Sequence, residues 1–320
     1  MYLCPQIHYA MNTITKIALT ALMLWGVAFG QNIYDRFNEA IQKGDSAQMT
    51  TLIRQIQASD DVSPDRYIAE FNYYFNRSNN SEGPINMSKE LPEDEDVTTW
   101  YALRDSVGNI SGYIYGVNRY DRTIADSGIA VINEGIARYP DRLDMRFGKV
   151  HVLGKLRDWK GFRDEILQVL ERTKVNNKQW VFPGNNEPAD TILTYSILEY
   201  QKDIFDHCKL KEESKVQDAV LLGYMRDIAT HMLELYPKDI FSMNIMAATY
   251  NASHDPSNAL KWLKKAEEIN PKDVIVLSNL ADTYYYLQDY ANEKKYLKKI
   301  VKYRDPQSKA YAKRLLNQKR

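Results

Sequence analysis

An internal repeat of 34 residues near the end of the chain limits what this sequence can fold into. Aligning 237–270 with 271–304 gives twelve identical positions. The identities fall at Pro237, Lys238, Asp239, Ala247, Thr249, Tyr250, Asp255, Asn258, Lys261, Leu263, Lys264 and Lys265, each with its counterpart 34 residues on. Self-similarity at this period indicates a helix–turn–helix unit. One such unit cannot bury its apolar face alone, so the copies are expected to stack.

The residue types within each copy explain how the unit would form. Each copy begins with Pro-Lys-Asp. Proline cannot continue a preceding helix, and the aspartate can accept hydrogen bonds from the first free N–H groups of the next helix. Ala247 and Ala281 are small enough to let a neighbouring helix approach closely. Tyr250 and Tyr284 are expected to fill the space between paired helices.

The two copies resemble the tetratricopeptide repeat, with a clear match over 237–306. In the first unit the family positions fall on Met243, Met246, Ala247, Tyr250, Ala259, Leu263, Ala266 and Pro271. In the second they fall on Leu277, Leu280, Ala281, Tyr284, Glu293, Leu297, Ile300 and Asp305. Glu293 replaces a small residue, and Pro306 stands one place late. The resemblance implies an α-solenoid of stacked helical hairpins.

Helical spacing continues upstream in a more degenerate form, and no strand alternation is evident, so we predict an all-α fold. The expected helices are 32–42, 47–57, 63–75, 124–139, 143–156, 162–173, 191–205 and 220–236. Segments 76–96 and 176–190 are rich in loop-forming residues. We therefore predict a degenerate helical-repeat region at 31–190, with loops at 76–96 and 176–190, and tetratricopeptide-like repeats with a basic C-terminal helix at 191–320.

The first 30 residues have the layout of a signal peptide. An apolar run of thirteen residues at 17–29 follows Lys16, and Ala28-Phe29-Gly30 precedes the expected cleavage before Gln31. The run is short for a membrane span, which needs about 20 residues. The residues before Met11 add nothing to this layout, so Met11 is a candidate start. We expect a periplasmic or secreted protein with no membrane span after cleavage. A buried helix and an uncleaved anchor are the alternatives.

Composition gives no sign of a cofactor or catalytic centre. Lys and Arg total 42 and Asp and Glu total 42, so the balance gives no reason to expect nucleic acid as the main partner. None of the five histidines lies in a His-Glu-x-x-His pattern, and no glycine-rich phosphate loop occurs. We expect no catalytic residues, no metal and no cofactor.

The resemblance implies that the first helix of each pair lines a concave binding groove. The expected groove residues are Asn244, Asn251, Asn279, Asp282, Tyr285, Tyr286, Lys309 and Lys313. Asn279, Lys309 and Lys313 match three of the five positions that clamp a terminal carboxylate in some family members. Asn244 and Ala248 occupy the other two, where the family has Lys and Asn, so the clamp is incomplete.

Three functions are open at this point. The favoured one is a non-catalytic protein–protein interaction scaffold in the cell envelope that binds a protein or peptide segment in this groove. The second is a glycan- or small-ligand-binding protein that uses the tyrosines and the loop around Trp180. The third is an enzyme with a scattered active site. The basic stretch 294–320 is either a solvated end that keeps the stack soluble or a surface for an anionic partner.

Overall fold

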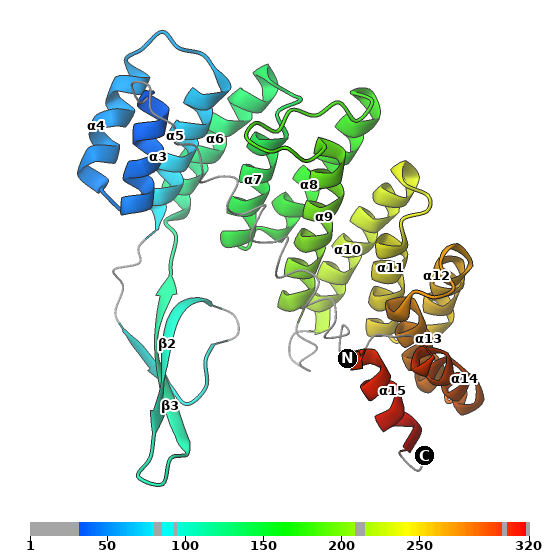
Figure 1. Ribbon diagram of the computed structural model, residues 1–320. Helices are drawn as coiled ribbons and strands as arrows, with labels where there is room; N and C mark the ends of the chain where they lie inside the picture. Colours follow the sequence, from blue (N-terminus) through cyan, green and yellow to red (C-terminus); the bar gives the residue numbers. More distant parts are fainter. Residues whose placement is uncertain (1–31, 80–84, 93–94, 209–214, 303–305, 318–320) are drawn as a thin grey trace. The chain divides into compact units, whose positions relative to one another are not determined.

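The computed structural model describes residues 32–79, 85–92, 95–208, 215–302 and 306–317. The predicted leader at 1–30 lies outside them. The described part is mainly helical, with thirteen helices and one three-stranded sheet (Figure 1). The prediction of a predominantly helical protein is confirmed, whereas the expectation of no strands is wrong.

The described residues fall into two compact units. The N-terminal unit contains those of Met23–Glu165 and Lys178–Ala189, and the C-terminal unit contains those of Ile166–Asn177 and Asp190–Arg320. Among the described helices, none is both long and apolar enough to cross a membrane.

Helices of the N-terminal unit begin and end close to the predicted positions. They are α3 (Ile33–Lys43), α4 (Ser46–Gln57), α5 (Pro64–Ser78), α6 (Arg122–Arg138), α7 (Leu143–Lys155) and the beginning of α8 (Trp159–Val175). Gly44 ends α3 at φ 66°, and the Asp45 side chain caps α4 by accepting from Gln48 N at 2.9 Å. Gly135 lets α6 pack tightly, because a Cβ there would lie 2.8 Å from Cβ of Tyr67 on α5.

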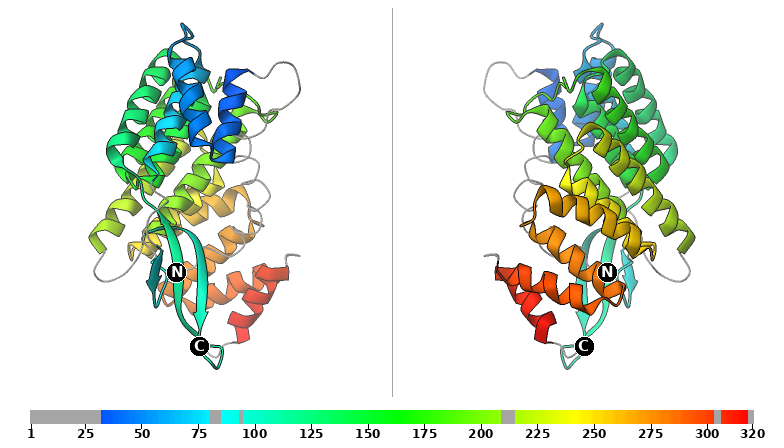
Figure 2. Two further views of the ribbon diagram at one scale, coloured as in Figure 1. Left: turned by 90° about the vertical axis from the view of Figure 1, so that its left-hand side faces the viewer. Right: turned by 90° about the vertical axis from the view of Figure 1, so that its right-hand side faces the viewer.

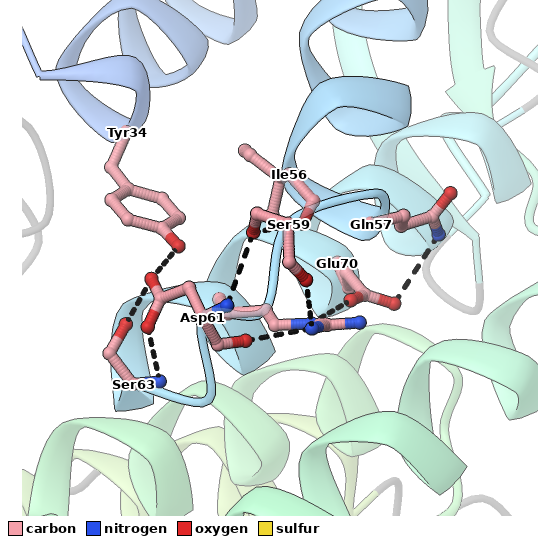
Figure 3. A network of polar contacts seen from close by, with 8 residues as sticks. Tyr34, Ile56, Gln57, Ser59, Asp61, Ser63 and Glu70 are labelled. Atoms are coloured by element: carbon pink, nitrogen blue, oxygen red, sulfur yellow. Dashed lines mark hydrogen bonds and ion pairs between the residues drawn. The ribbon is translucent and has the colours of Figure 1, made fainter.

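A polar network fixes the turn between α4 and α5 (Figure 3). The Tyr34 hydroxyl donates to the Asp61 carboxylate, which also accepts from Ser63 N at 2.7 Å. Arg66 donates to the Asp61 carbonyl at 2.7 Å and to Glu70 at 2.9 Å. Hydrogen bonds from Tyr34 and Ser63 lower the pKa of Asp61. The network therefore ties α3 to the start of α5 through an ionised carboxylate.

A β-sheet occupies the connection between α5 and α6, where we predicted a loop over 76–96 and no strands. It consists of β1 (Asn86–Ser88), β2 (Asp96–Arg104) and β3 (Ile110–Asn118) in the antiparallel order β1-β3-β2 (Figure 2). An isolated antiparallel bridge pairs Asn79, which follows α5, with Tyr120, which precedes α6. Large apolar side chains are exposed on both faces, including neighbouring Trp100 and Tyr101 on β2. Because neither face is consistently polar, the sequence lacks the alternation that marks a half-buried strand.

The described part of the C-terminal unit is helical, and its helices between residues 240 and 301 follow the 34-residue period. The helices of this unit are the remainder of α8, α9 (Ala189–His207), α10 (Lys215–Leu235), α11 (Ile240–Ala252), α12 (Pro256–Ile269), α13 (Val274–Tyr286), α14 (Tyr290–Val301) and α15 (Pro306–Asn317). Helix α11 packs against α12 and α13 against α14 (Figure 1). Asp239 and Asp273 cap α11 and α13 as predicted. Both small residues, Ala247 and Ala281, are buried in the core between these helices.

Ionic and aromatic contacts join the second helices of the two pairs. Glu267 of α12 accepts from Lys299 of α14 at 2.7 Å and from the Tyr296 hydroxyl at 2.9 Å. The Tyr296 ring is buried and stacks on Tyr284, with centroids 5.5 Å apart. Burial alone would raise the pKa of Glu267, but hydrogen bonds from Lys299, Lys264 and Tyr296 outweigh it and lower the pKa to about 2. These contacts give the α11–α14 segment a rigid support.

Candidate functional site

The predicted groove asparagines form a ladder of side-chain hydrogen bonds between α11 and α13. Asn279 Nδ2 donates to Asn244 Oδ1 at 2.9 Å, and Asn251 Nδ2 donates to Thr283 Oγ1 at 2.8 Å. Asn244 also donates to the Ile240 carbonyl at 3.0 Å, and only 8% of its surface is exposed. The structure thus pairs Asn244 with Asn279 across the two helices, whereas Asn251 pairs with Thr283. Their main contacts hold α11 beside α13 and leave Asn244 little surface for a ligand.

Three tyrosines form an exposed group at the turn between α13 and α14. Tyr285 and Tyr286 come from the last turn of α13, and Tyr290 is the first residue of α14. The ring of Tyr285 lies 6.1 Å from that of Tyr286 and 6.2 Å from that of Tyr290, measured between centroids. Their exposed fractions are 41%, 49% and 49%, in chain order. We call Tyr285, Tyr286 and Tyr290 the tyrosine cluster.

The turn that presents the tyrosine cluster is well defined. Gln288 adopts a left-handed backbone at φ 59°, and its N–H donates to the Tyr285 carbonyl at 2.9 Å. Asp289 then caps α14 by accepting from Asn292 N at 3.1 Å. His254 takes the same left-handed conformation at the equivalent turn of the first copy, with φ 58°. The rings are therefore mounted on a turn that the repeat itself specifies.

The charged residues of the predicted groove are Asp282 on α13 and Lys309 and Lys313 on α15. Asp282 is half-buried on α13, one turn before Tyr286. Burial, together with the Asp282 charge, raises the pKa of the Tyr286 hydroxyl, which stays protonated at neutral pH and can donate a hydrogen bond. Lys313 is exposed on α15. The backbone of Lys309 belongs to α15, but its side chain lies outside the described residues.

Trp180, the centre of the alternative glycan-binding prediction, belongs to the core of the N-terminal unit. Only 7% of its surface is exposed, and the Arg146 guanidinium lies 6.0 Å from its ring centroid. Arg146 donates to Glu165 at 2.9 Å, and Lys149 donates to the same carboxylate at 2.6 Å. The indole therefore has no open face of the kind that stacks on a sugar.

Tyr290 is the functional candidate that the sequence reasoning missed. It lies four residues after Tyr286 but on the next helix, and the resemblance directed attention to first-helix positions alone. The left-handed turn at Gln288 brings the residue that opens α14 next to the end of α13.

The chain matches no protein-family model, and no curated protein shows significant sequence similarity to it.

Proposed function

We propose that this protein is an exported, non-catalytic scaffold of stacked helical hairpins of the tetratricopeptide type. It holds a segment of a partner protein against the face formed by α11, α13 and the turn into α14. The observation that carries this proposal is the tyrosine cluster. Three adjacent aromatic side chains are each about half exposed on an otherwise well-packed helical support.

Tyrosine suits this role because its ring is apolar and its hydroxyl can hydrogen-bond. Contiguous exposed apolar surface commonly marks an interaction site, and tyrosine is enriched among the residues that dominate binding energy. Burying the exposed half of three tyrosines would remove roughly 300 Å² from water, given about 150–250 Å² per aromatic side chain. At about 25 cal/mol per Å², this contributes roughly 7 kcal/mol before the cost of association.

The helices that carry the tyrosine cluster are held together by side-chain contacts, which lowers the entropic cost of binding a partner there. The asparagine ladder fixes α11 against α13, and the Glu267 contacts fix α12 against α14. A surface that is already ordered loses little conformational entropy when a partner binds. An extended peptide segment is the partner that fits, because tyrosine hydroxyls can reach its backbone while the rings cover its side chains.

The cell envelope is the proposed place of action, and this part of the proposal depends on the leader layout at 17–30. We propose cleavage before Gln31 and a periplasmic or secreted product. N-terminal sequencing of the exported protein tests the proposed cleavage and should find Gln31 as the first residue. Protein recovered from the cytosol with its leader intact would contradict the proposal.

Affinity capture tests the binding proposal. The tagged protein should recover a specific partner from the envelope fraction of its own cells, and a Tyr285→Ala/Tyr290→Ala variant should lose it. Tyr101→Ala is a matched control, because Tyr101 is 73% exposed on β2 in the N-terminal unit. Undiminished recovery by the double variant, with an unchanged melting temperature, would place the binding surface elsewhere.

A further inference from the structure

Exposed lysines form a positively charged face on α14, close to the tyrosine cluster. Their spacing of three or four residues places them on one side of the helix and its C-cap, where they line one shallow hollow. They are Lys294, Lys295, Lys298 and Lys302. We call these four residues the lysine face.

No acid in the described part of the chain forms an ion pair with the lysine face. Lys299, which lines the same hollow, pairs with Glu267 at 2.7 Å and is therefore compensated. Glu293, the acid of α14, is only 6% exposed. Lys294 and Lys298 lie four residues apart, and like charges at this spacing destabilise a helix. A bound anion would remove this repulsion.

The first copy of the repeat shows that the helical hairpin itself does not require the lysine face. Position 294 corresponds to Leu260 on α12, and position 302 corresponds to Glu268. The equivalent surface of α12 therefore has fewer lysines and carries an acid. The helix dipole favours cations near a helix C-terminus, which accounts for Lys298 and Lys302 but not for Lys294 in the middle of α14.

The lysine face begins one helical turn from the tyrosine cluster. Tyr290 opens α14, and Lys294 follows it at the i+4 position, where side chains of a helix are neighbours. From Tyr290 to Lys302 the helix rises about 18 Å, which an extended segment of five or six residues spans at about 3.3 Å per residue. One segment can therefore contact the rings and the ammonium groups together.

We infer that the partner segment held at the tyrosine cluster is acidic, with apolar side chains on the rings and carboxylates on the lysine face. This inference rests on the proposed function and adds the charge of the partner to it. A peptide fits better than a nucleic acid or a membrane, because the lysines occupy one side of a single helix and lead directly to the tyrosines. Complementary charge would speed the encounter and fix the direction in which the segment lies.

Two fluorescent peptides test this inference. One has three leucines followed by five glutamates, and the other has five glutamines in place of the glutamates; both are also made in the reverse order. Fluorescence anisotropy should show the glutamate peptide binding about ten-fold more tightly in about 0.1 M salt. The difference should shrink in about 1 M salt, because the screening length falls from about 10 Å to about 3 Å.

Removing two charges from the lysine face identifies the contacts. Lys294→Gln/Lys298→Gln should weaken binding of the glutamate peptide about three- to ten-fold and leave binding of the glutamine peptide unchanged. Lys261→Gln/Lys265→Gln is the matched control. It removes two exposed charges from α12 and should bind both peptides as the unmodified protein does.

Tyr285→Ala/Tyr290→Ala separates this inference from the proposed function, because it should weaken binding of both peptides. Suppose that it does so, but the two peptides bind equally or the α14 lysine variant binds as its control does. The acidic-segment inference is then overturned, and the proposed function stands. Binding that depends on the lysines but not on the tyrosines would contradict the proposed function itself.

Two competitors test the other classes of anion. Vesicles of phosphatidylglycerol and a thymidine oligonucleotide should displace the glutamate peptide only weakly when compared at equal concentrations of negative charge. If either of them displaces it more effectively than unlabelled glutamate peptide does, the inference is overturned in favour of a lipid or a nucleic-acid ligand.

Discussion

Replacing Glu267 by glutamine should destabilise the C-terminal unit in a pH-dependent way. The carboxylate accepts from Lys299 at 2.7 Å, from Tyr296 at 2.9 Å and from Lys264 at 3.0 Å. Together these bonds connect α12 with α14. The glutamine variant keeps the shape of the side chain but removes the charge that both lysines face.

The size of the effect follows from the pKa. The pKa of Glu267 falls from 4.5 to about 2 on folding, and each pKa unit corresponds to about 1.36 kcal/mol. The full difference would be about 3 kcal/mol. Lys264 and Lys299 are 41% and 35% exposed, so solvent screening reduces the expected loss to about 1–2 kcal/mol.

The sign of the pH dependence is set by the lowered pKa. The contribution of Glu267 is complete above pH 4.5 and is lost as the pH falls toward 2, so less than half should remain near about pH 3. Urea denaturation of the variant and the unmodified protein should show the difference near neutral pH and a smaller one near about pH 3. Glu268→Gln, at the exposed neighbouring acid, should change little at either pH. An equal destabilisation at both pH values would refute this electrostatic explanation.

Three further changes test the packing and the caps. Ala281→Trp overpacks a buried contact and should cost about 1–3 kcal/mol or more, whereas Ala291→Trp on the exposed side of α14 should not; equal melting temperatures would contradict the assigned packing. Asp239→Ala removes the cap of α11 and should cost about 1 kcal/mol in chemical denaturation; an unchanged midpoint would show that the cap is dispensable. Tyr34→Phe removes the donor to Asp61 and should cost about 1–2 kcal/mol of the stability of the N-terminal unit; unchanged unfolding monitored within that unit would show that water replaces the hydroxyl.

Most helix positions could be predicted from the sequence because the signals for them are local. Proline stops, aspartate caps and apolar spacing act within a few residues, and the 34-residue repeat fixed the order of α11–α14. Gly44 and Gly135 show which structural features local sequence signals can predict and which they cannot. The turn at Gly44 is visible in the sequence, but the close packing at Gly135 depends on where Tyr67 lies in space.

The sheet and the details of the candidate site could not be predicted because they depend on contacts between distant residues. Trp100 and Tyr101 are adjacent and both exposed, which hides the period-two pattern of β2. The position of Asn244 in the repeat predicts a groove residue, but its hydrogen bond to Asn279 appears only when α11 and α13 are placed together.

Site-specific photo-crosslinking tests binding at the tyrosine cluster most directly. A benzophenone amino acid would replace Tyr286 in the protein expressed in its own cells. Lys265, exposed on α12 and not a member of the cluster, provides the control position. We predict a discrete adduct of one partner from position 286, none from position 265, and competition by excess unmodified protein. Equal labelling at both positions, or no adduct at position 286 while the partner is still captured, would contradict the proposed binding face.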